Sequence, residues 1–192
     1  MYIGLDLDGV TARYVEGLRD AVAKALGITP EDVGGEPEDY GFSNWREMKD
    51  RFKELHTGGV AEGLYRKLAI FEGASEILWK LSDEGDEIGV VTSRFVKHRQ
   101  NGIVVRDTAY WLDDNNVPYR DLCFLRDKTR FLADVYLDDA PHNIEAFQAA
   151  GRYVIIFDAP YNRHLEGDRA YNWNDVYALI QKRKAEVAAA AA

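Results

Sequence analysis

The sequence predicts an α/β protein: a doubly wound, Rossmann-like parallel sheet with a helical cap inserted after the first strand. Two observations lead to this fold class. Short, uninterrupted apolar runs, typical of strands covered on both faces, alternate with helical patterns over most of the chain. Between the first of these runs and the second, the chain has helical patterns and loops but no further buried strand. Alternation of this kind implies parallel strands joined by right-handed crossovers.

The first strand ends in two acidic residues. Asp6 and Asp8 are spaced i, i+2, so both carboxylates lie on one face of an extended strand. Gly9 follows at once and allows a sharp turn that leaves backbone amides open to a ligand. Open α/β sheets bind ligands at this end of their strands, and two carboxylates with free amides suit a phosphate group and a divalent cation. Taken alone, the stretch is equally consistent with a solvated turn.

Helices and one long loop are expected between the first strand and the rest of the sheet. The helical patterns cover residues 12–26, 43–55 and 60–68, and the loop, rich in Gly, Pro, Glu and Asp, covers residues 27–40. We therefore assign residues 12–72 to the cap, and residues 1–11 and 73–187 to the core. The Ala-rich tail, residues 188–192, carries no information about the fold.

The remaining strands and helices alternate through the core. Strands are expected over residues 88–92, 122–125, 135–137 and 153–157, and helices over residues 74–82, 104–115, 143–150 and 174–184. Pro141 fits the start of the third of these helices, because its missing N–H would have no partner there. With the first strand, these segments give a five-stranded sheet.

The composition is that of a globular protein with a substantial core. Of 192 residues, 46% are hydrophobic and 30% are charged, and the formal net charge is -9. The acidic balance disfavours binding to nucleic acid or to anionic membranes, because both surfaces repel it. The chain begins directly with the first strand, and no apolar run reaches membrane-spanning length, so we expect a cytoplasmic protein. The oligomeric state stays open, with a homodimer as one option.

Polar residues follow four of the expected strands and would meet at one edge of the sheet. They are Asp6 and Asp8, Thr92 and Ser93, Lys128, and Asp138 and Asp139. Each group alone has an ordinary interpretation, as a turn, a strand end, a solvated lysine or a helix cap. Taken together and in this order, the four groups resemble the four motifs of haloacid dehalogenase-like phosphohydrolases.

A closer resemblance within that superfamily is to the 5'(3')-deoxyribonucleotidases. It rests on Arg126-Asp127-Lys128-Thr129, Ala133-Asp134, Leu137-Asp138-Asp139 and Thr92-Ser93. The match covers most of the core, up to about residue 150. Arg94 departs from the family pattern, which usually has proline or another small residue after the Thr-Ser pair.

The resemblance implies phosphoryl transfer to an aspartate. With an ordinary pKa near ~3.9, Asp6 is ionised at neutral pH and needs no base to attack phosphorus. Lys128 and a divalent cation would offset its repulsion from the phosphate. The resemblance assigns the Mg²⁺ ligands to the Asp6 carboxylate, the Asp8 backbone carbonyl and the Asp139 carboxylate, with Asp138 in or near the coordination sphere. It also makes Asp8 the acid that protonates the leaving sugar oxygen and then the base that accepts a proton from water.

Further residues are candidates for contact with the phosphate or sugar. The Thr92 hydroxyl would bond a phosphate oxygen, and the backbone amide of Ser93 would assist. Asn143 lies four residues after Asp139 and is placed to orient that carboxylate. Arg126 is a candidate for holding the phosphate or sugar, and Arg94 is a weaker one.

Aromatic residues of the cap are candidates for stacking on a nucleobase. Tyr40 and Phe42 lie in a loop, and this position favours contact with a ligand. Trp45 lies at helical spacing with Met48 and Phe52, and this spacing favours packing inside the cap. Tyr40, Phe42 and Trp45 are kept as candidate binding residues, Trp45 with packing as the alternative, and Tyr65 is a further member of the expected aromatic wall.

We therefore expect a Mg²⁺-dependent phosphomonoesterase whose small-molecule substrate is a nucleoside monophosphate, in particular a deoxyribonucleotide. A phosphatase of sugar phosphates or other small metabolites is one alternative, and a phosphate- or nucleotide-binding protein without turnover is another. An aromatic cap favours nucleotides, whereas a cap lined with Arg, Lys and Asn would favour sugars. The presence of both Asp6 and Asp8 argues against a pure binding protein, which has no use for the second acid.

Overall fold

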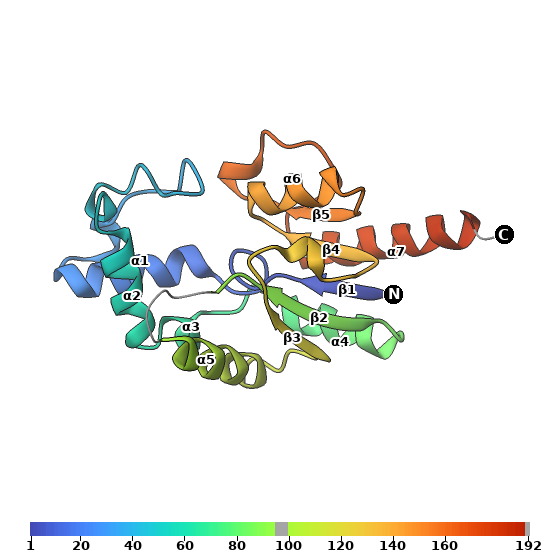
Figure 1. Cartoon of the computed structure of the whole chain (residues 1–192), viewed down its shortest axis with the longest axis horizontal. Coiled ribbons are helices and arrows are strands. Elements are labelled where there is room, and N and C mark those ends of the chain that lie inside the picture. Colours follow the sequence, from blue (N-terminus) through green and yellow to red (C-terminus); the bar gives the residue numbers. More distant parts are fainter. Residues whose placement is uncertain (95–99, 191–192) are drawn as a thin grey trace.

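The computed structural model describes residues 1–94 and 100–190, and within them six parallel strands form one sheet in the order β3-β2-β1-β4-β5-β6 (Figure 1). The strands are β1 (Tyr2–Leu5), β2 (Glu87–Thr92), β3 (Asp121–Phe124), β4 (Val135–Asp138), β5 (Val154–Phe157) and β6 (Arg169–Ala170). The predicted fold class, a doubly wound parallel sheet with a helical segment after the first strand, is confirmed. The sequence missed β6, because two residues are too few to show a strand pattern.

The direction of chain progress reverses at β1. The chain passes from β1 outward through β2 to β3, and then returns to the other side of β1 with β4. Leu5 is in register with Val90 on one side and with Leu137 on the other. The Asp6 amide donates to the Leu137 carbonyl at 3.1 Å, so the acidic ends of β1 and β4 lie beside each other. Ligands of open α/β sheets bind at such a reversal point.

Helices cover both faces of the sheet. They are α4 (Ala74–Asp83), α5 (Asn101–Asp114), α6 (Pro141–Ala149) and α7 (Trp173–Ala190). Side chains alternate along β4: Val135 and Leu137 join one apolar cluster with residues of α4, α5 and α7, whereas Tyr136 joins a second cluster with residues of α6. Burial on both faces explains why the strands are continuous apolar runs in the sequence.

The cap follows β1 and lies beyond the ends toward which the strands point (Figure 1). It contains α1 (Tyr14–Leu26), α2 (Phe52–Ala61), α3 (Leu64–Lys67) and the short 3-10 turns η1 (Pro30–Asp32) and η2 (Arg46–Met48). Its buried residues, among them Leu18, Val22 and Trp45, belong to the same apolar cluster as the α4, α5 and α7 side of the core. Cap and core therefore share one continuous hydrophobic interior on that side.

Two expected cap helices are wrong in their bounds. The helix expected over residues 43–55 is replaced by η2 and the start of α2, because Asp50 adopts a left-handed backbone angle that a continuous helix does not tolerate. The Ser43 hydroxyl does not cap a helix but donates to the Asp39 carboxylate. The helix expected over residues 60–68 is divided at Gly63, whose φ is 86°.

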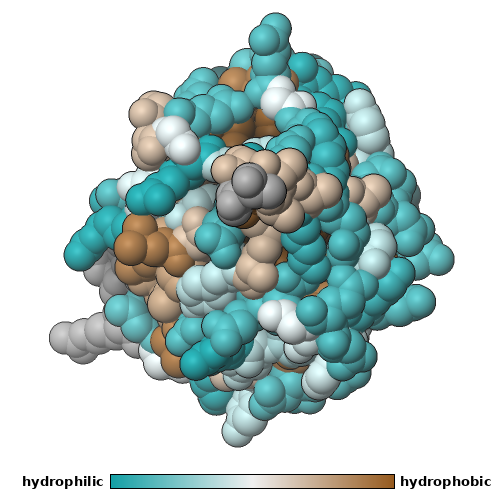
Figure 2. Space-filling model, turned by 90° about the vertical axis from the view of Figure 1, so that its right-hand side faces the viewer, coloured by the Kyte–Doolittle hydropathy of each residue, from teal (hydrophilic) through white to brown (hydrophobic). Residues whose placement is uncertain are grey.

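The opposite end of the molecule is shown in Figure 2 and is mainly hydrophilic, with small separate apolar patches. Scattered patches of this size are normal on protein surfaces. The terminal helix α7 runs on to Ala190, so most of the Ala-rich tail is helical, and residues 191–192 lie outside the described part. Among the described residues, no helix combines the length and apolar character needed to cross a membrane.

Candidate active site

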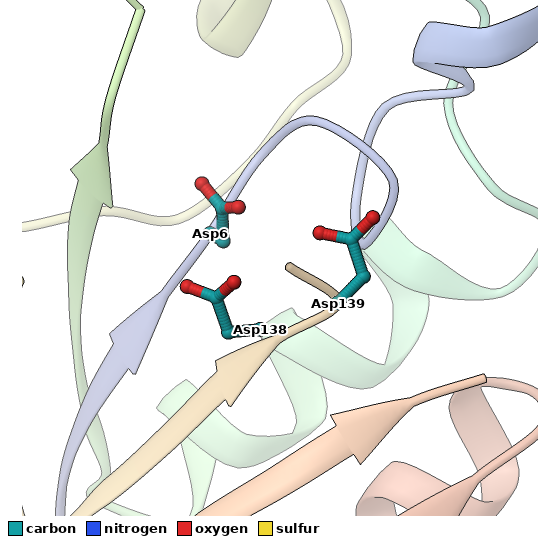
Figure 3. Close-up of side chains that lie close together, drawn as sticks. All are labelled: Asp6, Asp138 and Asp139. Atoms are coloured by element: carbon teal, nitrogen blue, oxygen red, sulfur yellow. The ribbon is translucent and has the colours of Figure 1, made fainter. Parts of the chain in front are cut away.

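Three carboxylates meet at the ends of β1 and β4. Asp6 follows β1, Asp138 ends β4 and Asp139 comes next, and their side chains point toward one another (Figure 3). One oxygen from each lies within 4.8 Å of the others, and all three side chains are buried. Buried carboxylate oxygens gathered in this way are suitable ligands for a hard divalent cation.

Within residues 1–94 and 100–190, one ammonium group, that of Lys128, contacts the carboxylates. Lys128 begins η3 (Lys128–Arg130), where the side chain of Asp127 accepts from the Thr129 amide and fixes the turn. The Lys128 Nζ lies 2.8 Å from Asp6 Oδ1 and 2.7 Å from Asp138 Oδ2, and it is as buried as they are. One buried positive charge thus meets three buried carboxylates.

Burial and the crowding of negative charge raise the pKa values of Asp6 and Asp139. Burial raises the pKa of Asp6 to about 7, against the lowering effect of Lys128. Burial, with repulsion from Asp6 and Asp138, raises the pKa of Asp139 well above its usual range. A divalent cation would remove this imbalance, so the donor set fits the Mg²⁺ expected from the sequence.

Asp138 is held by neighbouring donors on both of its oxygens. The Asn143 amide donates to Asp138 at 3.1 and 3.2 Å, and the Ala140 backbone amide donates to Oδ1 at 3.0 Å. Together with Lys128, these contacts use most of the acceptor capacity of the carboxylate. The expectation that Asn143 orients Asp139 is therefore wrong: the amide reaches the neighbouring carboxylate at the end of β4, and it fixes the partner of Lys128.

Asp139 is positioned by Tyr161 and Asn162, residues that the sequence did not offer as site residues. The Tyr161 hydroxyl donates to Asp139 Oδ2, and the Asn162 side-chain amide donates to the Asp139 backbone carbonyl at 2.8 Å. Both belong to η4 (Pro160–Asn162), which follows β5. Their position directly after an expected strand was a signal for a place near the site, but the sequence of residues 160–162 is also that of an ordinary loop.

Gly9 makes the approach of Asp139 possible. Its φ is 82°, and a Cβ atom built on it would overlap the Asp139 carboxylate. Only glycine combines this backbone angle with the space that the carboxylate occupies. The Gly9 predicted to allow a turn thus also accommodates an acidic side chain from another strand.

Asp8 lies apart from the three clustered carboxylates. Its side chain is ion-paired with Arg94, and Nε of Arg94 lies 3.0 Å from both carboxylate oxygens. Arg94 therefore faces an acid of the site, whereas the sequence offered it as a weak candidate for the phosphate or sugar. Within the part of the chain that the structure describes, the Asp8 carboxylate does not belong to the cluster of Asp6, Asp138 and Asp139. That the Asp8 backbone carbonyl binds the metal ion stays a prediction.

Thr92 and Ser93 lie at the end of β2, beside the carboxylates. Thr92 is buried, and its hydroxyl accepts from the Arg94 amide at 3.3 Å. The Ser93 hydroxyl donates to the Leu125 carbonyl at 2.9 Å, so its side chain ties β2 to β3. The backbone amide of Ser93 is the group that the sequence assigned to phosphate binding.

A cavity of about 170 Å³ opens above the carboxylates. Its lining brings together the acidic groups, the ends of β2 and an aromatic wall from the cap: Asp6, Asp8, Tyr14, Tyr40, Phe42, Phe52, His56, Tyr65, Thr92, Ser93, Arg94, Lys128, Asp139, Asn143 and Tyr161. The candidate residues Tyr40 and Phe42 therefore face the site. Cap and core each supply one side of this cavity.

Two candidate binding residues lie elsewhere. Trp45 is completely buried inside the cap, and its indole N–H donates to the Gly35 carbonyl at 2.8 Å. The expectation that Trp45 contacts the substrate is corrected: the residue packs, as its helical spacing with Met48 had allowed. Arg126 is exposed, and it is not one of the described residues that line the cavity.

The aromatic wall includes Tyr65, as expected, and also Tyr14, Phe52 and His56, which the sequence did not offer as ligand contacts. The Phe52 ring stacks on His56, with 5.5 Å between ring centroids and 6° between planes. His56 Nε2 lies 3.2 Å from the Tyr65 hydroxyl. Tyr14 packs against the rings of Phe42 and His56. Tyr14, Phe52 and His56 have the helical spacing of ordinary core residues, and this spacing does not distinguish residues that line a cavity.

Comparison with known proteins identifies the family. The model of the family described as "5' nucleotidase, deoxy (Pyrimidine), cytosolic type C protein" matches residues 1–186. The chain belongs to this family. Its members, the 5'(3')-deoxyribonucleotidases, are phosphomonoester hydrolases, so the predicted enzyme class and the closer resemblance are both confirmed.

Relatives within the family extend over much of the chain. A protein of Chlorobaculum tepidum named "Putative 5'(3')-deoxyribonucleotidase" is 34% identical over 184 residues, which are 93% of this chain and 89% of that protein. The 5'(3')-deoxyribonucleotidase of Bacillus subtilis is 28% identical over 116 residues, 59% of this chain and 63% of that protein.

Solved structures support the haloacid dehalogenase-like fold of the nucleotidase family. A haloacid dehalogenase-like hydrolase of Streptococcus pneumoniae matches with a TM-score of 0.62 at 12% identity, covering 93% of this chain and 97% of that one. At this identity the likeness concerns the fold alone. The core and the cap together account for this coverage, since the match extends over nearly the whole length of both chains.

Proposed function

We propose that this protein is a Mg²⁺-dependent deoxyribonucleotidase, which transfers the phosphate of a deoxyribonucleoside monophosphate to Asp6 and then to water. The observation that carries the proposal is the juxtaposition of Asp6, Lys128 and Asp139 beneath a cavity whose opposite wall is aromatic. Family membership supports a nucleotide as substrate.

Asp6 is the proposed nucleophile. Its carboxylate lines the cavity at the end of β1, and Lys128 holds one of its oxygens at 2.8 Å. An Asp6 oxygen attacks phosphorus, the bond from phosphorus to the sugar oxygen breaks, and an aspartyl-phosphate forms. The nearby ammonium of Lys128 stabilises the negative charge that develops on the phosphoryl oxygens.

Asp8 is the proposed acid and base. It lies two residues after Asp6, lines the same cavity and is partly accessible. It donates a proton to the departing sugar oxygen in the first step. In the second step it accepts a proton from the water that attacks phosphorus and restores the Asp6 carboxylate.

Asp6 and Asp139 would hold the Mg²⁺ ion, and Asp8 would contribute its backbone carbonyl. Bound there, the ion would neutralise charge between the carboxylates and the phosphate. Asp138 contributes indirectly, because its oxygens are used by Lys128, Asn143 and Ala140. Tyr161 keeps Asp139 in place through its hydroxyl group.

The residues of the cap favour a nucleotide over a sugar phosphate as the substrate. Its side of the cavity is built from Tyr14, Tyr40, Phe42, Phe52 and Tyr65, whose ring faces suit stacking on a base. The acidic net charge makes polymeric nucleic acid an unfavourable partner, so the proposed substrate is a free mononucleotide. The cytosolic type named in the family description supports a cytoplasmic place of action.

Phosphate release from a panel of monophosphates tests the proposal. The panel contains deoxyribo- and ribonucleotides, 5' and 3' isomers, and several sugar phosphates, each measured with Mg²⁺ and again after chelation by EDTA. We expect preferential turnover of deoxynucleotides, loss of activity with EDTA and recovery on addition of Mg²⁺.

The other outcomes separate the alternatives. Preferential turnover of sugar phosphates would reject the nucleotide assignment and leave the roles of Asp6, Asp8 and Lys128 standing. Activity that is indifferent to EDTA would reject the metal. Folded protein that turns over no member of the panel would favour a binding protein without catalysis.

A further inference from the structure

The Arg94 side chain is buried at the boundary between core and cap. It follows Thr92-Ser93 at the end of β2, and none of its side-chain surface is exposed. Its Nε lies 3.0 Å from both oxygens of Asp8, and its Nη2 lies 2.5 Å from Asp8 Oδ1. Nη1 donates to the Thr108 hydroxyl of α5 at 3.2 Å. Four hydrogen bonds thus join one planar group to two partners.

Two aromatic rings lie near the same guanidinium group. Its Cζ lies 4.4 Å from the ring centroid of Tyr65, in α3 of the cap, and 5.8 Å from that of Trp111, in α5. Contacts of this kind favour a cation over an aromatic face. Ring contacts and hydrogen bonds therefore both restrain the guanidinium group of Arg94, and the group contacts both core and cap.

Burial explains why the arginine and the acid belong together. Burying a guanidinium group is costly unless a carboxylate and further acceptors satisfy it. Asp8 provides that carboxylate, and 22% of its side chain stays accessible on the cavity side. The planar fork of an arginine also fixes the plane of a carboxylate that it binds through several N–H groups, which a lysine cannot do.

We propose that Arg94 is a positioning residue for Asp8: its guanidinium group, fixed by Thr108 and Tyr65, sets the orientation in which Asp8 exchanges a proton with the substrate. The inference rests on the proposed function of Asp8 as acid and base. It assigns a role to the residue that departs from the family pattern. Because Tyr65 belongs to the cap, the orientation of Asp8 then also depends on how the cap packs against the core.

Leaving groups of different basicity test this role. A deoxynucleoside leaves as an alkoxide that needs a proton, whereas p-nitrophenolate is stable without one. With enzyme in excess over substrate, release of the leaving group in a single turnover reports the first chemical step alone. Each variant is compared with the wild type on the same substrate, with Mg²⁺ present.

The expected pattern is selective loss. Arg94→Gln should slow release of the deoxynucleoside by roughly 10²-fold and release of p-nitrophenolate by less than about tenfold. Arg94→Lys should restore only part of the loss, because its single ammonium lacks the fork. Thr108→Val keeps the shape of the side chain, removes one acceptor of the guanidinium group and should show the same selectivity with a smaller loss.

A double-mutant cycle separates positioning from other roles. If Arg94 acts through Asp8, then Arg94→Gln should cost little once Asp8→Asn is present. Equal losses on both leaving groups, or additive losses in the cycle, would overturn the inference and indicate phosphate binding or a purely structural role. Thermal unfolding of each variant shows whether it is folded. If Arg94→Gln does not fold, the selectivity of Thr108→Val between the two leaving groups tests the inference in its place.

Failure of this inference can be told from failure of the proposed function. If wild-type protein releases phosphate and Asp6→Asn does not, the proposed function holds, and the cycle alone decides the role of Arg94. If the wild type releases no phosphate from any substrate, the proposed function falls, and the role of Arg94 falls with it.

Discussion

The core and the cap build their sides of the cavity in different ways. On the core side, Asp6, Lys128 and Asp138 are buried and joined by contacts of 2.7 to 2.8 Å. On the cap side, Phe52 and His56 meet through ring faces, and Phe52 is half-exposed. Satisfied buried polar networks are rigid, whereas exposed ring faces offer apolar area for contact with a ligand. The core is therefore suited to chemistry and the cap to recognition.

Removal of the nucleophile should produce the largest effect. Asp6→Asn keeps the shape of the side chain and removes one of three crowded buried carboxylates, so the fold should persist. Phosphate release should fall by roughly 10⁴-fold or more, the scale seen when a covalent catalyst loses its nucleophile. Turnover kinetics on a deoxynucleotide give the rate, and circular dichroism checks the fold. Substantial remaining turnover would remove Asp6 from the mechanism.

Trp45 tests whether the cap depends on packing rather than on ligand contact. Trp45→Ala should lower the free energy of unfolding by about 3–5 kcal/mol, because a completely buried ring is lost from the cap. Trp79→Ala is a matched control, since both indoles donate to a backbone carbonyl at 2.8 Å but Trp79 is half-exposed. Denaturant titration should show a much smaller change for Trp79. Similar losses for the two variants would contradict the packing role.

Gly9 tests how little displacement the core site tolerates. Gly9→Ala forces a Cβ atom onto the Asp139 carboxylate and should lower kcat by roughly 10²-fold, as expected for misplacement of about 1 Å in a catalytic site. Gly85→Ala is the matched control: Gly85 has a similar φ, 90°, and no heavy atom within 4 Å of the added Cβ. Both variants carry similar backbone strain. Equal kcat values for the two would show that Asp139 adapts.

The sequence predicted the core site because strand ends determine it. Asp6, Lys128 and Asp139 each follow an expected strand, and a parallel sheet brings such ends together whatever the details of packing. Asn143 shows the limit of this reasoning. Its position after the strand was correctly noted, but which of two adjacent carboxylates it reaches depends on how α6 packs on the sheet.

The cap was predicted less well because its side chains are placed by contacts between distant segments. Helical spacing places Trp45 and Phe52 on one face, yet one is buried in the cap and the other lines the cavity. The helix expected over residues 43–55 failed because Asp50 adopts a left-handed conformation, which periodicity does not reveal. Tyr161 follows an expected strand, but its hydrogen bond to Asp139 depends on how the turn after β5 packs, which the position alone does not reveal.

Phe52 should give the smallest effect and the sharpest test of recognition by the cap. Phe52→Ala removes an accessible ring that lines the cavity, and stacking on a base is worth about 1–3 kcal/mol, so KM for a deoxynucleotide should rise by roughly five- to tenfold at the lower end of that range. The KM for p-nitrophenyl phosphate should change little, because its small ring leaves no nucleoside to stack. Tyr171→Ala controls for loss of a surface ring, because Tyr171 is an exposed aromatic residue outside the described cavity lining. Equal increases in KM on both substrates would place Phe52 in general cap stability, and the division of labour between core and cap would then have to rest on other rings.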